Sequence, residues 1–312
     1  MSSRAVRRAL VTGANGFVGT AVCRHLIARG WTLRGSVRRS AAVLPEGVER
    51  LVSGPIDGTT DWTAGLEGVD AVVHCAARAH ILREEAADPL VAFRRVNVEA
   101  SANLARQAAA AGVARIVFIS SIGAMLAETG PDTASPYQTS KREAEIALAA
   151  ATGGTATELV VLRPPLIYGP GAPGNIRRLE SLIAKGLPLP LASIHNRRSL
   201  LYIGNLTEAV QAALTVEKVP EAPLALSDGT DLSTPDLVRR IAGASGRKAR
   251  LMPFPVGLLV LAGQLLGRPA AVEALTTSLT IDNDAVCKAL GWVPSFSVDE
   301  GLAASFAKSA NT

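Results

Sequence analysis

Short apolar runs alternate with amphipathic stretches through the first half of the chain. Each apolar run has the length of a buried strand, and each stretch between two runs has the length and pattern of a helix. This alternation predicts an α/β fold built on a doubly wound parallel sheet. The strands are expected at 9–12, 32–37, 70–77 and 116–119, and the clearest helices at 20–29 and 96–111.

The pattern changes after the apolar run at 159–162, where a segment rich in Pro and Gly follows. Beyond it the chain mixes polar loops with isolated helices, one at 206–214 and one that Ser233 or Thr234 would cap ahead of Pro235. A smaller, interleaved α/β lobe is therefore expected beside the main domain. The main domain would comprise 1–170 and about 200–225, and the smaller lobe 171–199 and 226–312.

Composition and charge narrow the class of protein. The 312 residues are 48% hydrophobic and 19% charged, as in a globular chain long enough for a sizeable core. The net charge of +5 is modest, and the arginines are spread along the chain rather than gathered into a stripe. We therefore expect an anionic small molecule as the partner and no nucleic acid.

The three cysteines, Cys23, Cys75 and Cys287, form no CxxC pair and no Cys/His cluster. Neither a disulfide framework nor a metal site is expected, and a reducing cytoplasm fits this pattern. The apolar segment 256–267 is shorter than the roughly 20 residues that a membrane span needs, so no stable membrane insertion is expected. Contact of this segment with a membrane surface stays open.

A glycine-rich turn follows the first predicted strand. Gly13 permits a tight turn, Gly16 lets the backbone approach a pyrophosphate, and Gly19 lets the next helix pack against the strand. A strand before the turn and a helix after it are the context that a Rossmann-type dinucleotide site requires. The sequence therefore predicts dinucleotide binding.

The residues after the second strand bear on which dinucleotide binds. NAD sites usually carry an acid there to hold the ribose 2′-hydroxyl, whereas this chain has Arg38 and Arg39 and no acid. Two guanidinium groups would suit a 2′-phosphate, so NADP(H) is favoured and NAD(H) is the alternative. The plain alternative is a solvated basic turn.

Tyr137 and Lys141 are four residues apart in a predicted helix, so their side chains share one face. A lysine ammonium beside the phenol is expected to lower the tyrosine pKa and make the pair a proton donor and acceptor. Ser121 follows the strand at 116–119 and could hydrogen-bond a substrate carbonyl. Alone, such a pair also occurs in ordinary amphipathic helices.

These motifs together resemble the extended short-chain dehydrogenase/reductases, the nucleotide-sugar epimerase/dehydratase group. The resemblance covers nearly the whole chain and includes His74-Cys-Ala-Ala77, Asn97 and Leu162-Arg-Pro-Pro-Leu-Ile-Tyr-Gly-Pro-Gly171. Segments around 186–206, 226–237 and 290–294 are similar to bacterial reductases of UDP-4-keto-6-deoxy-N-acetylhexosamines, the UDP-N-acetylquinovosamine dehydrogenase type. This narrower resemblance implies NAD(P)H-dependent reduction of a C4 keto group in the synthesis of surface polysaccharide (O-antigen) precursors.

The resemblance also implies roles for individual residues. Ser121, Tyr137 and Lys141 take the catalytic roles, and Ser121 also contacts the substrate. Asn175 and Arg198 fall where nucleotide-sugar enzymes contact the UDP diphosphate, within two basic segments that could equally be solvated loops. The cofactor-binding positions are Gly13, Asn15, Gly16, Phe17, Val18, Arg38, Arg39, Ile56, Asp57, Ala76, Ala77, Asn97, Tyr137, Lys141, Pro164 and Leu166.

Two departures and three rival functions stay open. Pro55-Ile56 displaces Asp57 from its usual place near the adenine, and the loop between Ser121 and Tyr137 is short and lacks the aromatic-Gly pair common in 4-epimerases. The rivals are a UDP-sugar 4-epimerase with bound NAD, an NADPH-dependent reductase of a non-sugar carbonyl, and an NADP(H)-binding protein without turnover. Family members pair subunits through the helices at 97–111 and around Tyr137, so a homodimer is expected by resemblance.

Overall fold

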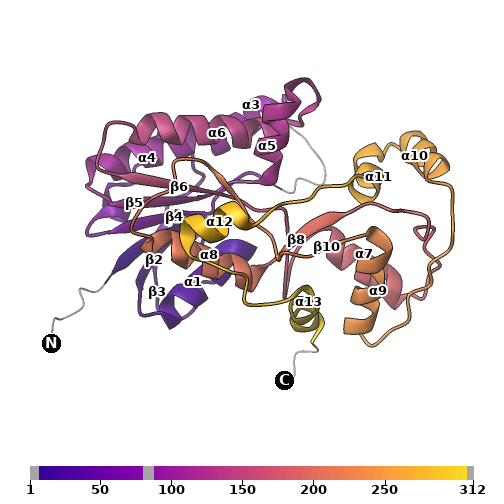
Figure 1. Cartoon of the computed structure of the whole chain (residues 1–312). Coiled ribbons are helices and arrows are strands. Elements are labelled where there is room, and N and C mark those ends of the chain that lie inside the picture. The colour runs from indigo at the N-terminus through magenta and orange to yellow at the C-terminus, as the bar shows by residue number, and fades with distance from the viewer. Residues whose placement is uncertain (1–6, 80–87, 308–312) are drawn as a thin grey trace. The chain divides into compact units, whose positions relative to one another are not determined.

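The computed structural model describes residues 7–79 and 88–307 and divides the chain into two compact units (Figure 1). The first unit comprises the chain up to Pro165, Leu206–Leu226 and Asp284–Val293. The second comprises Leu166–Asn205, Ser227–Asn283 and the chain from Pro294.

Residues 284–293 lie in the first unit, whereas the sequence analysis assigned them to the smaller lobe. Val286 and Leu290 are buried there, on a short helix that packs against the last strand of the first unit's sheet. Two apolar side chains at a spacing of four gave too short a pattern to show which sheet they would cover.

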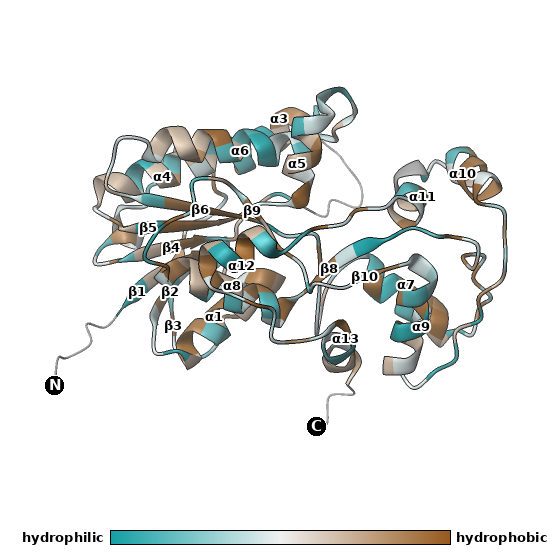
Figure 2. Cartoon of the chain, in the orientation of Figure 1, coloured by the Kyte–Doolittle hydropathy of each residue, from teal (hydrophilic) through white to brown (hydrophobic). Residues whose placement is uncertain are grey.

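The first unit is built on a seven-stranded parallel sheet, as the sequence predicts. The inner strands are apolar because helices cover both faces of the sheet, and Figure 2 shows them in brown. The strands are β1 (Arg8–Thr12), β2 (Thr32–Val37), β3 (Val48–Val52), β4 (Ala71–His74), β5 (Arg115–Ile119), β6 (Glu158–Arg163) and β9 (Leu224–Ala225), in the spatial order β3-β2-β1-β4-β5-β6-β9.

Helices cover the two faces of this sheet in two groups (Figure 1). The helices α3 to α6 pack on one another over one face, and α1, α8 and α12 lie over the other. On this second face a hydrogen bond joins α1 to α8, with His25 Nε2 2.7 Å from Gln211 Oε1. The bounds are α1 (Phe17–Ala28), α2 (Thr63–Leu66), α3 (Pro89–Arg94), the π-helical turn η1 (Arg95–Glu99), α4 (Ala100–Ala110), α5 (Ile122–Thr129), the 3₁₀ turn η2 (Pro131–Thr133), α6 (Pro136–Thr152), α8 (Ile203–Thr215) and α12 (Asp284–Leu290).

Two capping groups fix the helices that carry the predicted catalytic residues. Ser135 forms a capping box with Gln138 at the start of α6, and Pro136 occupies the first turn. Ser121 caps α5 by accepting a hydrogen bond from the Gly123 N–H at 3.1 Å. The caps therefore set where α5 and α6 begin, and with them the positions of Ser121 and Tyr137.

The second unit contains a three-stranded sheet and five helices within the described residues. Asp228 stabilises the centre of this unit, because its carboxylate accepts hydrogen bonds from the Tyr168 hydroxyl and the Tyr202 N–H. Ser233 caps α9, as predicted. The elements are β7 (Leu166–Tyr168), β8 (Arg198–Tyr202), β10 (Asp231–Leu232), α7 (Asn175–Ala184), α9 (Thr234–Ala244), α10 (Val256–Leu265), α11 (Pro269–Thr276) and α13 (Val298–Phe306).

Helix α10 is apolar around most of its circumference and yet lies on the surface (Figure 2). Leu265 and Leu266 are 79% and 75% exposed, and Leu258 and Leu261 are about half exposed. α10 packs on α11, where Gly263 lies directly against Val272. None of the helices in the described ranges is both long and apolar enough to cross a membrane.

Candidate active site

Two glycines at the junction of β1 and α1, one in the turn and one in the first part of α1, have no room for a larger side chain. Gly13 has φ +63°, and a Cβ there would lie 3.0 Å from the Ala76 Cα. A Cβ on Gly19 would lie 2.1 Å from the carbonyl oxygen of Gly13. α1 therefore begins directly against the end of β1, and its first turn carries no acidic side chain. This N-terminus suits an anionic group such as a pyrophosphate.

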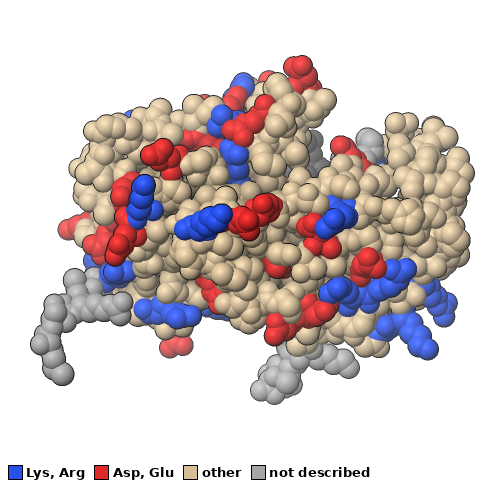
Figure 3. Space-filling model, viewed as in Figure 1, with Lys and Arg blue, Asp and Glu red and all other residues tan. Residues whose placement is uncertain are grey.

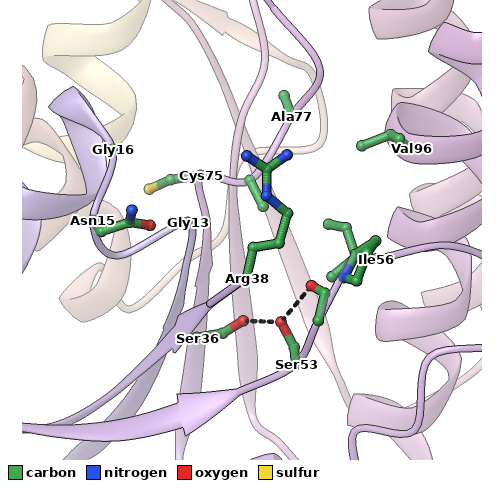
Figure 4. A pocket seen from close by; sticks show the side chains of 13 residues that line it. Gly13, Asn15, Gly16, Ser36, Arg38, Ser53, Ile56, Cys75, Ala77 and Val96 are labelled. Atoms are coloured by element: carbon green, nitrogen blue, oxygen red, sulfur yellow. Dashed lines mark hydrogen bonds between the residues drawn. The ribbon is translucent and has the colours of Figure 1, made fainter. Parts of the chain in front are cut away.

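A pocket lies at the carboxyl ends of the first unit's strands, next to this turn (Figure 4). The strand order reverses between β1 and β4, which is where doubly wound sheets bind ligands. Seven lining residues are among the predicted cofactor-binding positions: Gly13, Asn15, Gly16, Arg38, Ile56, Ala76 and Ala77. The other lining residues are Ser36, Ser53, Gly54, Pro55, Cys75 and Val96.

One side of this pocket is polar and carries a single charged side chain. Arg38 extends into the pocket from the end of β2 (Figure 4), and no Asp or Glu is among the described lining residues. Near it the Ser36 and Ser53 hydroxyls lie 2.9 Å apart. The two serines were missed from the sequence. Ser36 is a polar residue inside an apolar strand, which was a usable signal, but Ser53 follows β3, a strand that the sequence analysis did not identify.

Nine of the sixteen predicted cofactor contacts do not line the pocket, and four of these nine lie close in sequence to residues that do. Phe17 and Val18 form the start of α1, and Arg39 is exposed beside Arg38. Asp57 points to other partners: its carboxylate pairs with Arg95 at 2.9 Å and accepts from the Thr59 hydroxyl at 2.7 Å. These hydrogen bonds lower the pKa of Asp57 to about 2.

Asn97 also lies outside the pocket lining and has structural partners. Its side chain accepts a hydrogen bond from the Arg78 N–H at 2.7 Å, and its amide nitrogen donates to the Ser140 hydroxyl at 3.0 Å. Asn97 therefore joins the loop after β4 to α6 at Ser140, the residue before Lys141.

Tyr137 lies in the first turn of α6 and close to Ser121. Burial raises the pKa of Tyr137 above its ordinary value, and a side-chain hydrogen bond with Ser121 opposes this shift. The Phe93 ring packs edge-on against the Tyr137 ring, with centroids 6.0 Å apart. The structure thus brings the predicted acid and the predicted carbonyl-binding hydroxyl together.

Lys141 is 1% exposed and directed at the end of β5. Its Nζ donates to the Ile119 carbonyl oxygen at 2.7 Å and lies 4.1 Å from the centroid of the Phe118 ring. Burial lowers the pKa of Lys141 to about 7, and Glu145 and then Cys75 act in the opposite direction. The expectation that Lys141 lowers the pKa of Tyr137 was wrong for this structure, because burial outweighs any effect of the lysine charge.

His74 is a buried residue that two hydrogen bonds hold in place. Its ring nitrogens lie 2.6 Å from the Thr12 hydroxyl and 2.7 Å from the Ser101 hydroxyl. Burial, and then the charge of Lys141, lower the pKa of His74 to about 3, so the ring is neutral. No group of His, Cys, Asp and Glu in the described ranges has the arrangement of a metal site.

We expect replacement of Lys141 with Met to remove a pH dependence of stability. The folded-state pKa of about 7 is below that of an unfolded lysine, so unfolding takes up a proton and the free energy of unfolding rises with pH above 7. Urea denaturation of both proteins at pH values of about 7, the midpoint of the folded lysine, and about 8.5, where the folded lysine is mostly deprotonated and the unfolded lysine is still protonated, measures this slope. An equal slope in the Lys141→Met protein would contradict the buried-lysine assignment.

A buried ion cluster joins the elements that carry these residues. Arg163, at the end of β6, contacts Glu145 of α6 at 2.5 Å and Glu128 of α5 at 2.9 Å. The Ser120 hydroxyl donates to the same Glu145 carboxylate. Arg142 contacts Glu128 from the surface side at 2.9 Å. α5, α6 and β6 are therefore held to one another directly beside Ser121, Lys141 and Pro164.

The remaining predicted contacts lie at or beyond the end of β6. Pro164 follows β6, and its carbonyl oxygen accepts from the Ile122 N–H at 2.9 Å. Leu166 starts β7, in the second unit. Asn175 is the exposed first residue of α7. Arg198 starts β8 and donates to the Thr277 carbonyl oxygen at 3.0 Å, and burial lowers its pKa.

The model of the NAD dependent epimerase/dehydratase family matches residues 9–223. The chain belongs to this family. The protein is therefore an enzyme of a family with NAD-dependent oxidoreductase-type chemistry, and the family resemblance drawn from its motifs is confirmed.

Relatives within the epimerase/dehydratase family cover almost the whole chain. A UDP-glucose 4-epimerase of Vibrio cholerae is 36% identical over 304 residues, which are 94% of this chain and 92% of that protein. A 2-alkyl-3-oxoalkanoate reductase of Stenotrophomonas maltophilia is 27% identical over 94% of this chain and 96% of its own length. An epimerase and a reductase are thus both among the relatives of this chain.

A solved structure supports the same fold. The UDP-glucose 4-epimerase of Thermus thermophilus in complex with NAD superimposes with a TM-score of 0.74 at 25% identity, over 96% of this chain and 98% of that one. The Rossmann-type parallel sheet is thus shared with a nucleotide-sugar enzyme of the family.

Proposed function

We propose that this enzyme reduces the C4 keto group of a UDP-linked 4-keto-6-deoxy-N-acetylhexosamine with NADP(H). The observation that carries the choice of cofactor is Arg38, which extends into a pocket that no described Asp or Glu side chain lines. The hydrogen-bonded Ser36 and Ser53 side chains line the same pocket. A guanidinium in a pocket that also carries two hydroxyls suits a ribose 2′-phosphate, whereas a ribose diol would lack its usual acidic acceptor. A net reduction oxidises one NADPH in each turnover, so the cofactor must dissociate and be replaced.

The nicotinamide supplies a hydride when it is bound. The protein's own groups would bind and protonate the carbonyl oxygen: the Ser121 hydroxyl hydrogen-bonds it, and the Tyr137 hydroxyl donates a proton to the developing alkoxide. A raised tyrosine pKa keeps the phenol protonated and ready to donate at neutral pH. Lys141, held at the end of β5, supplies positive charge close to this centre when it is protonated.

The UDP part of the substrate would bind in the second unit. Arg198 offers a partly buried cation. Asn175 is the first residue of α7 and has an exposed side-chain amide, and Gly174 before it has φ +91°. A cation and amide donors suit a diphosphate. In Figure 3 Lys and Arg side chains also gather over the region of α7 and α9. We further propose a homodimer paired through α4 and α6 and a place in surface polysaccharide precursor synthesis.

Replacing Arg38 with Ser should weaken NADPH binding by about tenfold or more, roughly 1.4 kcal/mol, and change NADH binding little. The physical reason is the loss of charge opposite the 2′-phosphate, a group that NADH lacks. Fluorescence titration of both reduced cofactors measures the two affinities. Arg39→Ser is the matched control, because Arg39 is exposed and does not line the pocket. Equal affinities for NADPH and NADH in the unaltered protein would sink the cofactor proposal.

A second candidate is a UDP-sugar 4-epimerase with tightly held NAD. The observation in its favour is the 36% identity to the Vibrio cholerae UDP-glucose 4-epimerase. The two candidates predict different purified proteins. Stoichiometric NAD released on denaturation, with interconversion of UDP-glucose and UDP-galactose and no added cofactor, would favour the epimerase. An empty protein that oxidises NADPH only with a UDP-4-keto sugar would favour the reductase.

A further inference from the structure

Helix α10 presents an exposed apolar ridge. Leu258, Leu261 and Leu265 stand at positions i, i+3 and i+7, so their side chains lie along one face of the helix. These side chains are 52%, 49% and 79% exposed. Gly263 lies on the opposite face, where it packs against Val272 of α11. The contact with α11 therefore leaves the leucine ridge in solvent.

The ridge belongs to a wider apolar surface. Fifteen large apolar side chains of the described residues are exposed, and six of them lie between 252 and 266. In Figure 3 the surface over α10 carries no charged side chain on the side that faces the viewer. Single exposed apolar residues need no explanation, but a concentration of this kind marks a surface that a partner or a membrane covers.

The chain on both sides of α10 is positively charged. Its basic side chains are exposed and form no ion pair within the described ranges. They are Arg247, Lys248 and Arg250 before the helix and Arg268 after it. The sequence has no Asp or Glu between Asp236 and Glu273. The apolar surface thus lies in a segment whose positive charge has no acidic partner.

We propose that α10 and these four basic residues bind the surface of an anionic lipid bilayer. A bilayer supplies both kinds of partner that the segment lacks, since acyl chains accept the leucine ridge and phosphate headgroups accept the cations. The ten residues of α10 are about 15 Å long, roughly half the thickness of the hydrocarbon core. The helix would therefore lie within one leaflet, and the binding is peripheral and reversible. This inference goes beyond the proposed reaction and does not depend on it.

Co-flotation of the full chain with lipid vesicles tests the apolar part of this surface. The protein should bind vesicles of equal parts phosphatidylglycerol and phosphatidylcholine. Leu261→Ser/Leu265→Ser should weaken this binding at least about tenfold, because two leucines no longer enter the acyl region. Both side chains are exposed, so the variant should fold. The matched control is Val43→Ser/Val293→Ser, which changes two exposed apolar residues of the first unit and should bind as the unaltered protein does.

The same assay tests the basic residues. Arg247→Gln/Lys248→Gln should weaken binding to the anionic vesicles by about fivefold for each charge removed. Vesicles of phosphatidylcholine alone should bind the unaltered protein more weakly, and added salt should weaken binding to the anionic vesicles. Arg24→Gln/Arg29→Gln is the matched control, because it removes two exposed positive charges at the end of α1 and should leave binding unchanged.

Three outcomes would overturn the proposal. The first is no binding of the unaltered protein to the anionic vesicles. The second is binding that Leu261→Ser/Leu265→Ser leaves intact, which would mean that the vesicles attract the protein by its charge alone. The third is self-association in sedimentation velocity that the same variant abolishes, without vesicle binding, which would make the ridge an interface between two copies of the chain.

Discussion

Replacing Tyr137 with Phe is expected to lower kcat by about 10²- to 10⁴-fold, the range that a positioned general acid contributes. The phenol is the one acidic hydroxyl that the structure places beside Ser121 among the residues it describes, and burial keeps it protonated at neutral pH. Phe retains the ring that packs on Phe93 and removes only the donated proton. Cofactor binding should therefore stay within about threefold of the unaltered enzyme.

The measurement is turnover under saturating substrate, with NADPH oxidation for the reductase and sugar interconversion for the epimerase. Both proposed reactions pass a proton through the same hydroxyl, so the prediction does not depend on which one is correct. Tyr202→Phe is the control, since it removes a tyrosine hydroxyl in the second unit, where the ring packs on Phe296. A kcat of Tyr137→Phe within tenfold of the unaltered enzyme would exclude Tyr137 as the acid.

Replacing Arg163 with Met should destabilise the first unit by about 3–5 kcal/mol, the cost of breaking a buried ion pair from one side. Arg163 is 6% exposed and contacts two carboxylates. Its loss leaves Glu145 with the Ser120 hydroxyl and with Arg142 Nη1 at 3.8 Å. The free-energy cost of leaving the Glu145 carboxylate without Arg163 is larger than the hydrophobic free energy gained by burying a Met side chain.

Urea denaturation, followed by circular dichroism, measures this loss. Arg142→Met is the matched control: Arg142 binds Glu128 from a position that is one-third exposed, so its loss should cost at most about 1 kcal/mol. The double variant Arg163→Met/Glu145→Met should recover most of the stability, because no unpaired charge is left. A loss under about 1 kcal/mol for Arg163→Met alone would contradict the buried cluster, since a pair this well buried should cost more than a surface pair.

The fold and the centre of the site could be predicted because their signals are local. Gly13 and Gly19 stand between a predicted strand and a predicted helix at the spacing of a dinucleotide-binding turn, and a Cβ at either would meet backbone. Tyr137 and Lys141 share a helix, so one periodicity argument placed both. The parallel sheet followed from apolar runs that alternate with helices.

What the sequence missed depends on contacts between distant segments. The Asp57 carboxylate pairs with Arg95, thirty-eight residues away, so its neighbours in sequence could not show that it turns from the pocket. The pKa of Tyr137 depends on how deeply its side chain is buried, which the spacing of residues in the sequence does not show. The neighbours of Glu145 in the sequence do not indicate that Arg163 and Ser120 bind its carboxylate.

The parallel sheet of the first unit also has a consequence for the order in which the protein can fold. Its edge strand β9, which pairs with β6, and the helix α12 beside it come from residues 224–225 and 284–290, long after the first six strands. During synthesis the paired edge of β6 therefore stays open until most of the chain has left the ribosome. Such an unpaired edge can pair with the same strand of another nascent chain. Misassembly through this edge can therefore occur while the residues between β6 and β9 are being synthesised, and slower translation of these residues lengthens that interval.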